Sequence, residues 1–196
     1  MKEGRKIQNE IKRLAILDKE LGFDLPFNDF IWVMLQLTSQ SYGFRIPNRF
    51  MKEFNLEKVS SNLNLGDCKD KNENYYEVKC SLVTVSNPQL NFVQIRLWQK
   101  VKGYICITVN TLVDPMKTEI FYLDREQMTK ECELMSNSAH GTIEANKNNE
   151  NKELRFSLSV DPNDFNYIRW KNYSREHQFS KLNSQSIFPA PLCVVS

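Results

Sequence analysis

The stretch that organises this chain is DCKDKNENYYEVKC, residues 67–80. Its second half is rich in aromatic and β-branched residues, which predicts a strand over residues 75–85. Successive side chains of a strand point to opposite faces, so Glu77 and Lys79 share one face and Val78 lies on the other. A further carboxylate, Asp67, arrives from the preceding segment. Two carboxylates and an ammonium are the groups that hold a hard divalent cation and act on a phosphate or an attacking water.

The flanking sequence predicts alternating helices and strands. We expect a helix over residues 90–102, ended by Gly103, and then a buried strand over 104–110 that is apolar on both faces. A strand, a helix and a second strand in this order predict a right-handed βαβ unit with parallel strands. The other expected elements are helices over residues 5–21, 29–40 and 47–59, a short strand over 119–123, a helix from an Asp124–Gln127 capping box to Met135, a hairpin of strands 142–145 and 154–160, and a helix that starts at Asp161-Pro162 with Phe165 and Ile168 on one side and Trp170 off that stripe.

Length and composition predict one globular domain. The 196 residues divide into a helical part (1–59), a core (60–135) and a hairpin, helix and tail (136–196). No apolar run approaches the roughly 20 residues that span a bilayer, and the basic, amphipathic start lacks the features of a signal peptide. The five cysteines are scattered without a CxxC pair, which favours reduced thiols in a cytoplasmic protein over a zinc site. The net charge of +2 neither demands nor excludes a nucleic-acid partner.

The Glu77-x-Lys79 pair has two interpretations. By itself such a pair is common on a solvent-facing strand, where it forms a surface salt bridge. Three features favour a functional site instead: the residues flanking the pair are apolar, Asp67 lies upstream at a separation that a hairpin can bridge, and a helix and a buried strand are expected to follow. Asp70 remains an alternative first carboxylate.

The segment Gly66-Asp67 … Glu77-Val78-Lys79 resembles the PD-(D/E)xK nuclease motif, with Gly66 where the family pattern has proline. The whole chain resembles a type II restriction endonuclease of that superfamily. The resemblance implies an α/β (α+β), restriction-endonuclease-like fold with a mixed central β-sheet flanked by helices. It also implies Mg²⁺ bound by Asp67, Glu77 and the Val78 carbonyl, and Lys79 acting on the attacking water and the charged transition state. The implied reaction is sequence-specific double-strand cleavage of DNA that leaves 5′-phosphate and 3′-hydroxyl ends.

Further expectations follow from the same resemblance. Such sites often take another acidic residue from an upstream helix, and Glu53 and Glu57 are the candidates, although helix-surface solvation explains both equally well. The implied partners are double-stranded DNA and, for a palindromic site, a second copy of the chain in a homodimer. We expect no membrane association and no nucleotide cofactor.

Several side chains are candidates for DNA contact. In the expected helix Gln94 lies on the apolar side, where it reaches the active site or DNA, or equally bonds a neighbouring loop carbonyl. The other candidates are basic or small polar residues: Arg96, Lys100, Ser138, His140, Arg169, Lys171 and Tyr173. Solvated helix surfaces explain the basic residues as well, and a turn position explains His140. The rival functions are a structure-specific or repair nuclease of the same superfamily and a non-catalytic DNA-binding subunit with this fold.

Overall fold

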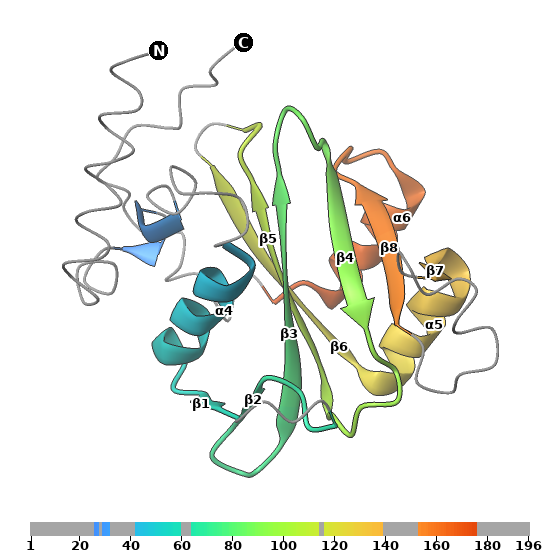
Figure 1. The fold of residues 1–196 in the computed structure, drawn as a ribbon. Helices are drawn as coiled ribbons and strands as arrows, with labels where there is room; N and C mark the ends of the chain where they lie inside the picture. The colour runs from blue at the N-terminus through green and yellow to red at the C-terminus, as the bar shows by residue number, and fades with distance from the viewer. Residues whose placement is uncertain are drawn as a thin grey trace.

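The fold is built on a five-stranded mixed sheet with β3 at its centre (Figure 1). The structure, a computed structural model, describes residues 26–27, 29–31, 42–59, 64–113, 116–138 and 153–175. β3 and β5 are parallel, whereas the other neighbouring strands are antiparallel. The strand order is β1 (Glu57–Lys58), β2 (Cys68–Lys69), β3 (Tyr75–Val83), β5 (Gly103–Asn110) and β6 (Lys117–Asp124).

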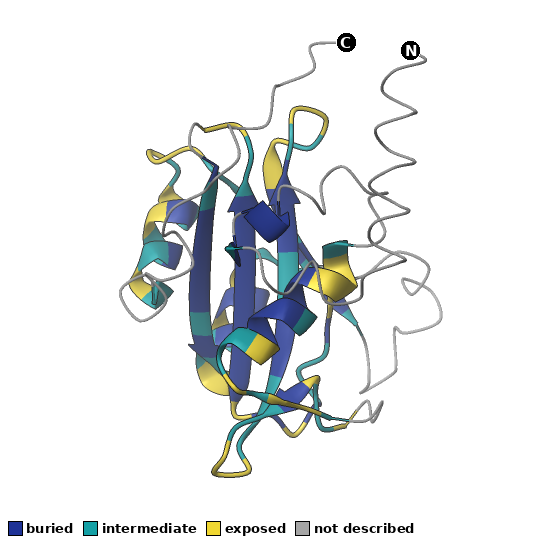
Figure 2. Cartoon of the chain, turned by 90° about the vertical axis from the view of Figure 1, so that its left-hand side faces the viewer, coloured by how far each residue is buried: buried dark blue, intermediate teal, exposed yellow. Residues whose placement is uncertain are grey.

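Different elements cover the two faces of this sheet (Figure 1). Helix α4 (Tyr42–Glu53) packs against β3 from one side. The other side carries a three-stranded sheet, β4 (Gln89–Ile95), β8 (Leu154–Ser159) and β7 (Asn137–Ser138), together with α5 (Arg125–Met135), α6 (Phe165–Trp170) and the 3₁₀ turn η2 (Lys171–Tyr173). Figure 2 shows the sheet strands buried over most of their length, with exposed turns at both ends. The prediction of a mixed α/β sheet flanked by helices is therefore confirmed.

Two apolar cores lie on either side of the large sheet. The alternation along β3 sends Val78 and Leu82 into the core beneath α4, whereas Val83 joins the core between the two sheets. Trp170 is fully buried in this second core, where its ring stacks on Phe92 with centroids 5.6 Å apart. The two faces of β3 thus differ as the alternation predicted, and Glu77 and Lys79 lie on the face toward the second sheet.

The helix predicted over residues 90–102 is wrong, because residues 89–95 form strand β4. Leu90, Phe92 and Ile95 are buried, and the pairing register with β8 shifts between Phe92 and Ile95. Gln94 lies in this irregularity with a φ of 54°. One extra residue in a strand turns a spacing of two into a spacing of three. The bulge therefore gives the apolar residues a helix-like spacing in the sequence. In the structure, the connection between the parallel strands β3 and β5 contains a strand of the second sheet and not a helix.

The helix predicted over residues 47–59 is also displaced. α4 starts at Tyr42 and contains Pro47, which therefore does not mark the helix start. It ends in a Schellman motif: Asn55 has a φ of 53°, and the Leu56 N–H donates to the Met51 carbonyl at 2.8 Å. A left-handed asparagine provides the stop, and Leu56 then turns back onto the first core.

The last helix is shorter than expected. Its N-cap is Asp164, whose carboxylate accepts the N–H groups of Asn166 and Tyr167, whereas Asp161 closes the preceding turn. Phe165 and Ile168 are exposed, and Tyr167 and Trp170 are the buried pair. The side that carries Phe165 and Ile168 is therefore the exposed one, and Trp170, which lies off that stripe, packs in the second core.

Other predictions are confirmed. The strands expected at 75–85, 104–110, 119–123 and 154–160 are β3, β5, β6 and β8, and β3 and β5 are parallel as expected. The Asp124–Gln127 capping box opens α5. The helix over 5–21, most of that over 29–40 and the strand 142–145 lie outside the described residues. In the part of the chain that is described, no helix is long and apolar enough to cross a membrane.

Candidate active site

The candidate site lies at the edge of β3 that β2 leaves uncovered. β2 pairs with β3 only at Tyr75 and Tyr76. One residue pair further along, the Val78 N–H donates instead to Oδ2 of Asp67 at 2.8 Å. The N–H and C=O of a strand residue point to the same side of the strand, so the Val78 carbonyl faces this edge as well. A carboxylate and a backbone oxygen therefore meet at the uncovered edge.

Gly66 brings Asp67 to this position. Its φ is +75°, and a Cβ there would lie 2.7 Å from the Tyr76 carbonyl oxygen. Only glycine accepts both the left-handed backbone and the close approach. The Asp67 N–H then donates to the Tyr76 carbonyl at 2.9 Å, and the Asp67 carbonyl accepts the Val59 N–H at 2.9 Å. The backbone of Asp67 is thereby held between β3 and the residue that follows β1.

Glu77 and Lys79 form a close ion pair on the face toward the second sheet. Lys79 Nζ lies 2.6 Å from Glu77 Oε1, and only 3% of the Glu77 side chain is exposed. The amide of Gln99, which is also buried, donates from Nε2 to Glu77 Oε2 at 3.1 Å. Both oxygens of Glu77 are thus held, which distinguishes this pair from a surface salt bridge between mobile side chains. The interpretation of the motif as an ordinary surface pair does not fit this burial.

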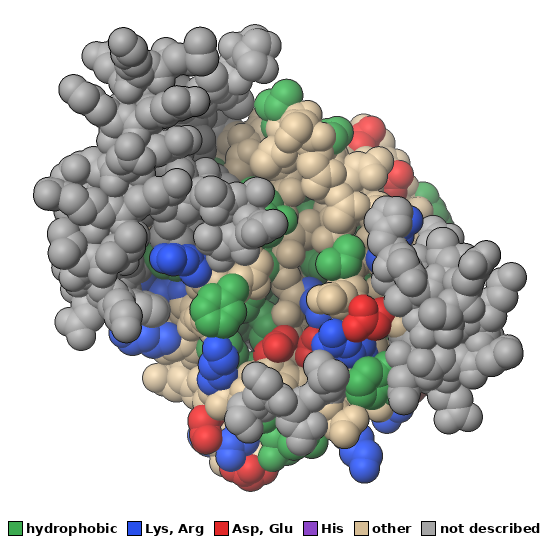
Figure 3. Space-filling view, viewed as in Figure 1, with side chains coloured by type: hydrophobic (Ala, Val, Ile, Leu, Met, Phe, Trp, Pro, Cys, Tyr) green, Lys and Arg blue, Asp and Glu red, His purple; other side chains and the backbone are tan. Residues whose placement is uncertain are grey.

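Asp67, Glu77 and Lys79 line one cavity of about 610 Å³. Its walls come from α4, from β3 and from the end of β4, and Val78 is among the lining residues of β3. Figure 3 shows acidic and basic side chains gathered between α4 and β4 on this face. Three basic residues (Lys58, Lys79, Arg96) and two acidic residues line it among the described residues. The cavity is polar and charged at the point where the motif residues meet.

The pKa of Asp67 is raised above its ordinary value. Asp67 is an exposed residue, but it lies in the lining of the concave cavity, and burial among the surrounding atoms is the largest cause. The negative charge of Glu77 raises the pKa further, while the Val78 N–H, Lys79 and Arg96 oppose the change. A neighbouring negative charge disfavours ionisation of Asp67, and a cation bound beside its carboxylate would oppose that effect.

The donor set fits Mg²⁺. Two carboxylates and a backbone carbonyl are hard oxygen donors, and Mg²⁺ usually takes one or two protein carboxylates and keeps several waters. No cluster of three or more His, Cys, Asp or Glu side chains suited to a metal occurs in the described part of the chain. A cage of three or more such side chains is therefore not present among these residues, and Asp67 and Glu77 are the two carboxylates that line the cavity.

Asp70 has a different role from Asp67. Its Oδ1 accepts the backbone N–H groups of Asn72 and Asn74, and its Oδ2 accepts the Asn74 amide and the Tyr76 hydroxyl. Chiefly through the Asn74 side-chain hydrogen bond, these contacts hold its pKa at about 2. Asp70 closes the hairpin and lines another cavity, on the α4 side of the sheet. The geometry therefore favours Asp67 over Asp70 as the first carboxylate.

The two accessory-acid candidates do not line the cavity among its described residues. Glu53 accepts from Arg49 one turn earlier in α4, at 3.1 Å. Glu57 is exposed and lies 3.5 Å from Lys69. Each carboxylate already has a basic partner, Arg49 of α4 for Glu53 and Lys69 of β2 for Glu57, so a third acid for the site comes from neither in this conformation.

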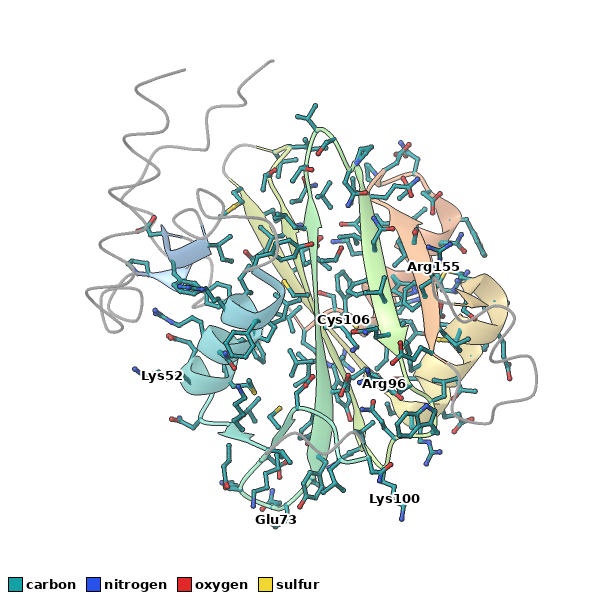
Figure 4. The ribbon with its side chains drawn as sticks, in the orientation of Figure 1. Lys52, Glu73, Arg96, Lys100, Cys106 and Arg155 are labelled. Carbon is teal, nitrogen blue, oxygen red and sulfur yellow. The ribbon has the colours of Figure 1, made fainter. Side chains whose placement is uncertain are left out.

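The DNA-contact candidates Gln94 and Arg96 line the cavity, and Lys100 lies apart from it. Gln94 is exposed in the β4 bulge, so the prediction that it is half-buried on a helix is wrong. Arg96 forms an ion pair with Glu153, with Nη2 and Oε1 2.7 Å apart. Figure 4 shows Arg96 between β3 and β4, while Lys100 extends from one end of the molecule. Arg96 is thus the cation placed to act at the site.

The cluster of Arg169, Lys171 and Tyr173 is engaged within the protein. Arg169 and Tyr173 both donate to Glu131, a fully buried residue of α5, at 2.8 Å for each of their shortest contacts. Lys171 donates to Glu119 of β6. None of the three lines the cavity, and their charges are compensated by buried carboxylates, so their positions are explained by packing of α6 and η2 on the sheets.

Two other candidates contribute little to the description of the site. Ser138 lies in β7 and is paired through its backbone with Leu154 of β8. His140 lies outside the described residues. Their predicted contacts with DNA stay predictions.

Sequence reasoning missed Gln99 and the aromatic part of the cavity. Gln99 was hidden by the wrong helix, which placed Gln94 toward the site instead. The exposed ring of Phe44 lines the cavity beside Lys58, because α4 starts five residues earlier than Pro47 suggested. The one available signal was the polar residues Gln99, Lys100 and Lys102 just before Gly103 and the buried strand, which are compatible with a loop as well as with a helix end.

No protein-family model matches this chain, and a search of curated proteins found no match. Its function must therefore be argued from the site itself.

Proposed function

We propose that this protein is a Mg²⁺-dependent endodeoxyribonuclease of the PD-(D/E)xK type, acting as a restriction endonuclease on double-stranded DNA. The observation that carries the proposal is the convergence of Asp67, Glu77 and Lys79 in one cavity at the uncovered edge of β3. The resemblance of the motif and the mixed sheet that bears it are further support. The products would carry 5′-phosphate and 3′-hydroxyl ends.

Each residue has a role that its surroundings support. Asp67, Glu77 and the Val78 carbonyl would hold Mg²⁺, which lowers the pKa of bound water and neutralises charge on the scissile phosphate. Lys79, held by Glu77 and 14% exposed, orients the attacking water or helps to remove its proton, and offsets negative charge in the transition state. Gln99 keeps Glu77 from rotating away by holding its second oxygen.

Arg96 has a role at the rim of the site. Its guanidinium is partly exposed and paired with Glu153, and it opposes the raised pKa of Asp67, so its charge acts within the cavity. A phosphate of the bound strand can replace Glu153 as its partner, since arginine pairs with both groups in the same planar geometry. This contact would position DNA without reading its sequence.

The decisive experiment incubates the protein with plasmid DNA and Mg²⁺. We expect discrete fragments from the unaltered protein, and a loss of about 10²- to 10⁴-fold in rate for Lys79→Ala. Glu77→Gln should also be inactive, while Glu73→Gln is the matched control because Glu73 is an exposed residue of the hairpin. A smear of products would indicate nonspecific cleavage and would overturn the proposed restriction activity. Uncut DNA with a salt-sensitive gel shift would overturn the enzymatic proposal in favour of a binding subunit.

Metal binding can be measured without cleavage. Mg²⁺ that binds the folded state raises the melting temperature, since a ligand stabilises the state it binds. We expect this rise for the unaltered protein and for Glu73→Gln, and its loss for Glu77→Gln. Size-exclusion chromatography with light scattering would test the accompanying proposal that the chain works as a homodimer on a palindromic site.

A further inference from the structure

An exposed aromatic ring stands at the mouth of the proposed active site. Phe44, in the first turn of α4, is 62% exposed and lines the same cavity as Asp67 and Glu77. A single exposed hydrophobic residue on a protein surface needs no explanation. A ring within the wall of a charged cavity is different, because it offers a flat apolar surface directly beside groups that act on phosphate.

A lysine side chain lies over the Phe44 ring. Lys58 Nζ lies 4.4 Å from the centroid of the Phe44 ring. Sites that bind single nucleic-acid strands combine an aromatic side chain, on which a base stacks, with basic groups that follow the backbone. Phe44 supplies the first of these groups and Lys58 the second. Charge at the site agrees with this ligand, because basic residues outnumber acidic ones in the cavity before any metal binds.

The part of the wall formed by β4 also contains an apolar side chain, beside Gln94. Val93 of β4 is 52% exposed and lines the cavity across from α4. The cavity volume of about 610 Å³ lies within the range of about 300–1,000 Å³ that small-molecule sites occupy. One unstacked nucleotide fits such a volume, whereas a base-paired duplex is too wide to enter and would lie across the mouth. The apolar side chains of Phe44 and Val93 favour contact with a base over contact with water.

We propose that Phe44 stacks against a base that has left the helical stack beside the scissile phosphate, so that the site prefers DNA with an unpaired nucleotide at the cut. This inference rests on the proposed function, because the cut is assigned to Asp67, Glu77 and Lys79. Extruding a base from an intact duplex costs free energy that a mismatch or a single-stranded loop has already supplied. The stacking surface therefore selects substrates in which that base is free.

The test compares two exposed phenylalanines that each have a basic side chain over the ring. Phe165 is 75% exposed on α6, with the Arg169 guanidinium carbon 5.6 Å from its ring centroid, and it does not line the cavity. Binding is measured by fluorescence anisotropy with Ca²⁺ in place of Mg²⁺, to separate binding from cleavage. The probes are two oligonucleotide duplexes of one sequence, fully paired or with a three-nucleotide unpaired loop, each with 2-aminopurine at the central position.

We expect the unaltered protein to bind the looped duplex more tightly and to quench its 2-aminopurine fluorescence. Phe44→Ala should weaken binding of the looped duplex by about 5- to 150-fold, the equivalent of one lost stacked base, and should abolish the quenching. Phe44→Trp should retain both effects, and Phe165→Ala should change neither. Equal affinities of the unaltered protein for the two duplexes, or unchanged quenching in Phe44→Ala, would overturn the inference.

The two proposals fail in different ways. One outcome would support the proposed nuclease and reject the stacking site: Glu77→Gln loses cleavage, while the unaltered protein and Phe44→Ala each cleave both duplexes equally. Selective binding of the looped duplex by a protein that never cleaves would keep the stacking site and reject the nuclease. Binding of neither duplex would reject both.

Discussion

Replacing Glu131 with alanine should lower the free energy of unfolding by about 3 to 4 kcal/mol. Glu131 is fully buried, and its carboxylate accepts from Arg169 Nη2 at 2.8 Å, the Tyr173 hydroxyl at 2.8 Å and Trp170 Nε1 at 3.0 Å. Breaking a buried ion pair costs about 3–5 kcal/mol. Because 20% of the Arg169 side chain reaches water, we take the lower half of that range. The matching fall in melting temperature is roughly 6–16 °C for a chain of this size.

The effect should depend on pH with a defined sign. Burial raises the pKa of Glu131, but the hydrogen bond from Arg169, followed by the other contacts, outweighs it, so the net pKa lies below the ordinary value of 4.5. A carboxyl with a lowered pKa in the folded state stabilises the fold fully above its unfolded pKa. That stabilisation disappears as pH falls through the folded pKa. The stability difference between the two proteins should therefore be largest near neutral pH and shrink below about pH 4.5.

The assay is urea denaturation followed by circular dichroism at several pH values. Glu133→Ala on the same helix is the matched control, since Glu133 is exposed and such changes usually lie within about 0.5 kcal/mol. A cost below about 1 kcal/mol for Glu131→Ala, or a cost that does not shrink in acid, would refute the assignment of Glu131 as the buried partner that fixes α6. It would also return Arg169 and Tyr173 to the set of candidate DNA contacts.

Further predictions concern the placement of the first carboxylate. Gly66→Ala should destabilise the protein by more than about 1 kcal/mol, because a Cβ on this left-handed residue would meet the Tyr76 carbonyl. Gly43→Ala is the matched control: it has open space around it and should stabilise α4 by up to about 1 kcal/mol. Thermal denaturation measures both changes. Because the Asp67 pKa is raised, the rise in melting temperature with Mg²⁺ should fade on acidification at a higher pH than for an ordinary aspartate. The rise in melting temperature with Mg²⁺ should be absent at every pH in Asp67→Asn. Asp70→Asn should keep this rise and should lower only the melting temperature measured without Mg²⁺. A rise that is lost in Asp70→Asn alone would reverse the assignment of the first carboxylate.

The local part of the fold was predictable from the sequence. The side chains of β3 point alternately to its two faces over nine residues, so the strand period alone predicts which residues share a face. The burial of Glu77 agrees with its apolar neighbours in the sequence. The capping box at Asp124 and Gln127 is likewise a contact between residues three apart. Both signals are short-range, and short-range signals survive whatever the rest of the chain does.

Prediction failed where a single residue changed the spacing. The bulge at Gln94 converted the alternation of β4 into a helix-like pattern, so the element over the site was misassigned and Gln99 was overlooked. Pro47 was taken as a helix start because proline is common there, although α4 had already begun at Tyr42. In both places packing against β3 outweighs the local preference.

The sequence by itself determined the motif strand and the side of it on which Glu77 and Lys79 lie, because these depend only on alternation along one strand. Only the tertiary structure placed Asp67, and not Asp70, in the cavity with Glu77, joined Gln99 to Glu77 across 22 residues and paired Arg169 with Glu131 across 38. The physical reason is that these partners are chosen by how α4, β4 and α6 pack on the sheet. A charged side chain shows its charge in the sequence, but its partner depends on which chain segments are buried together.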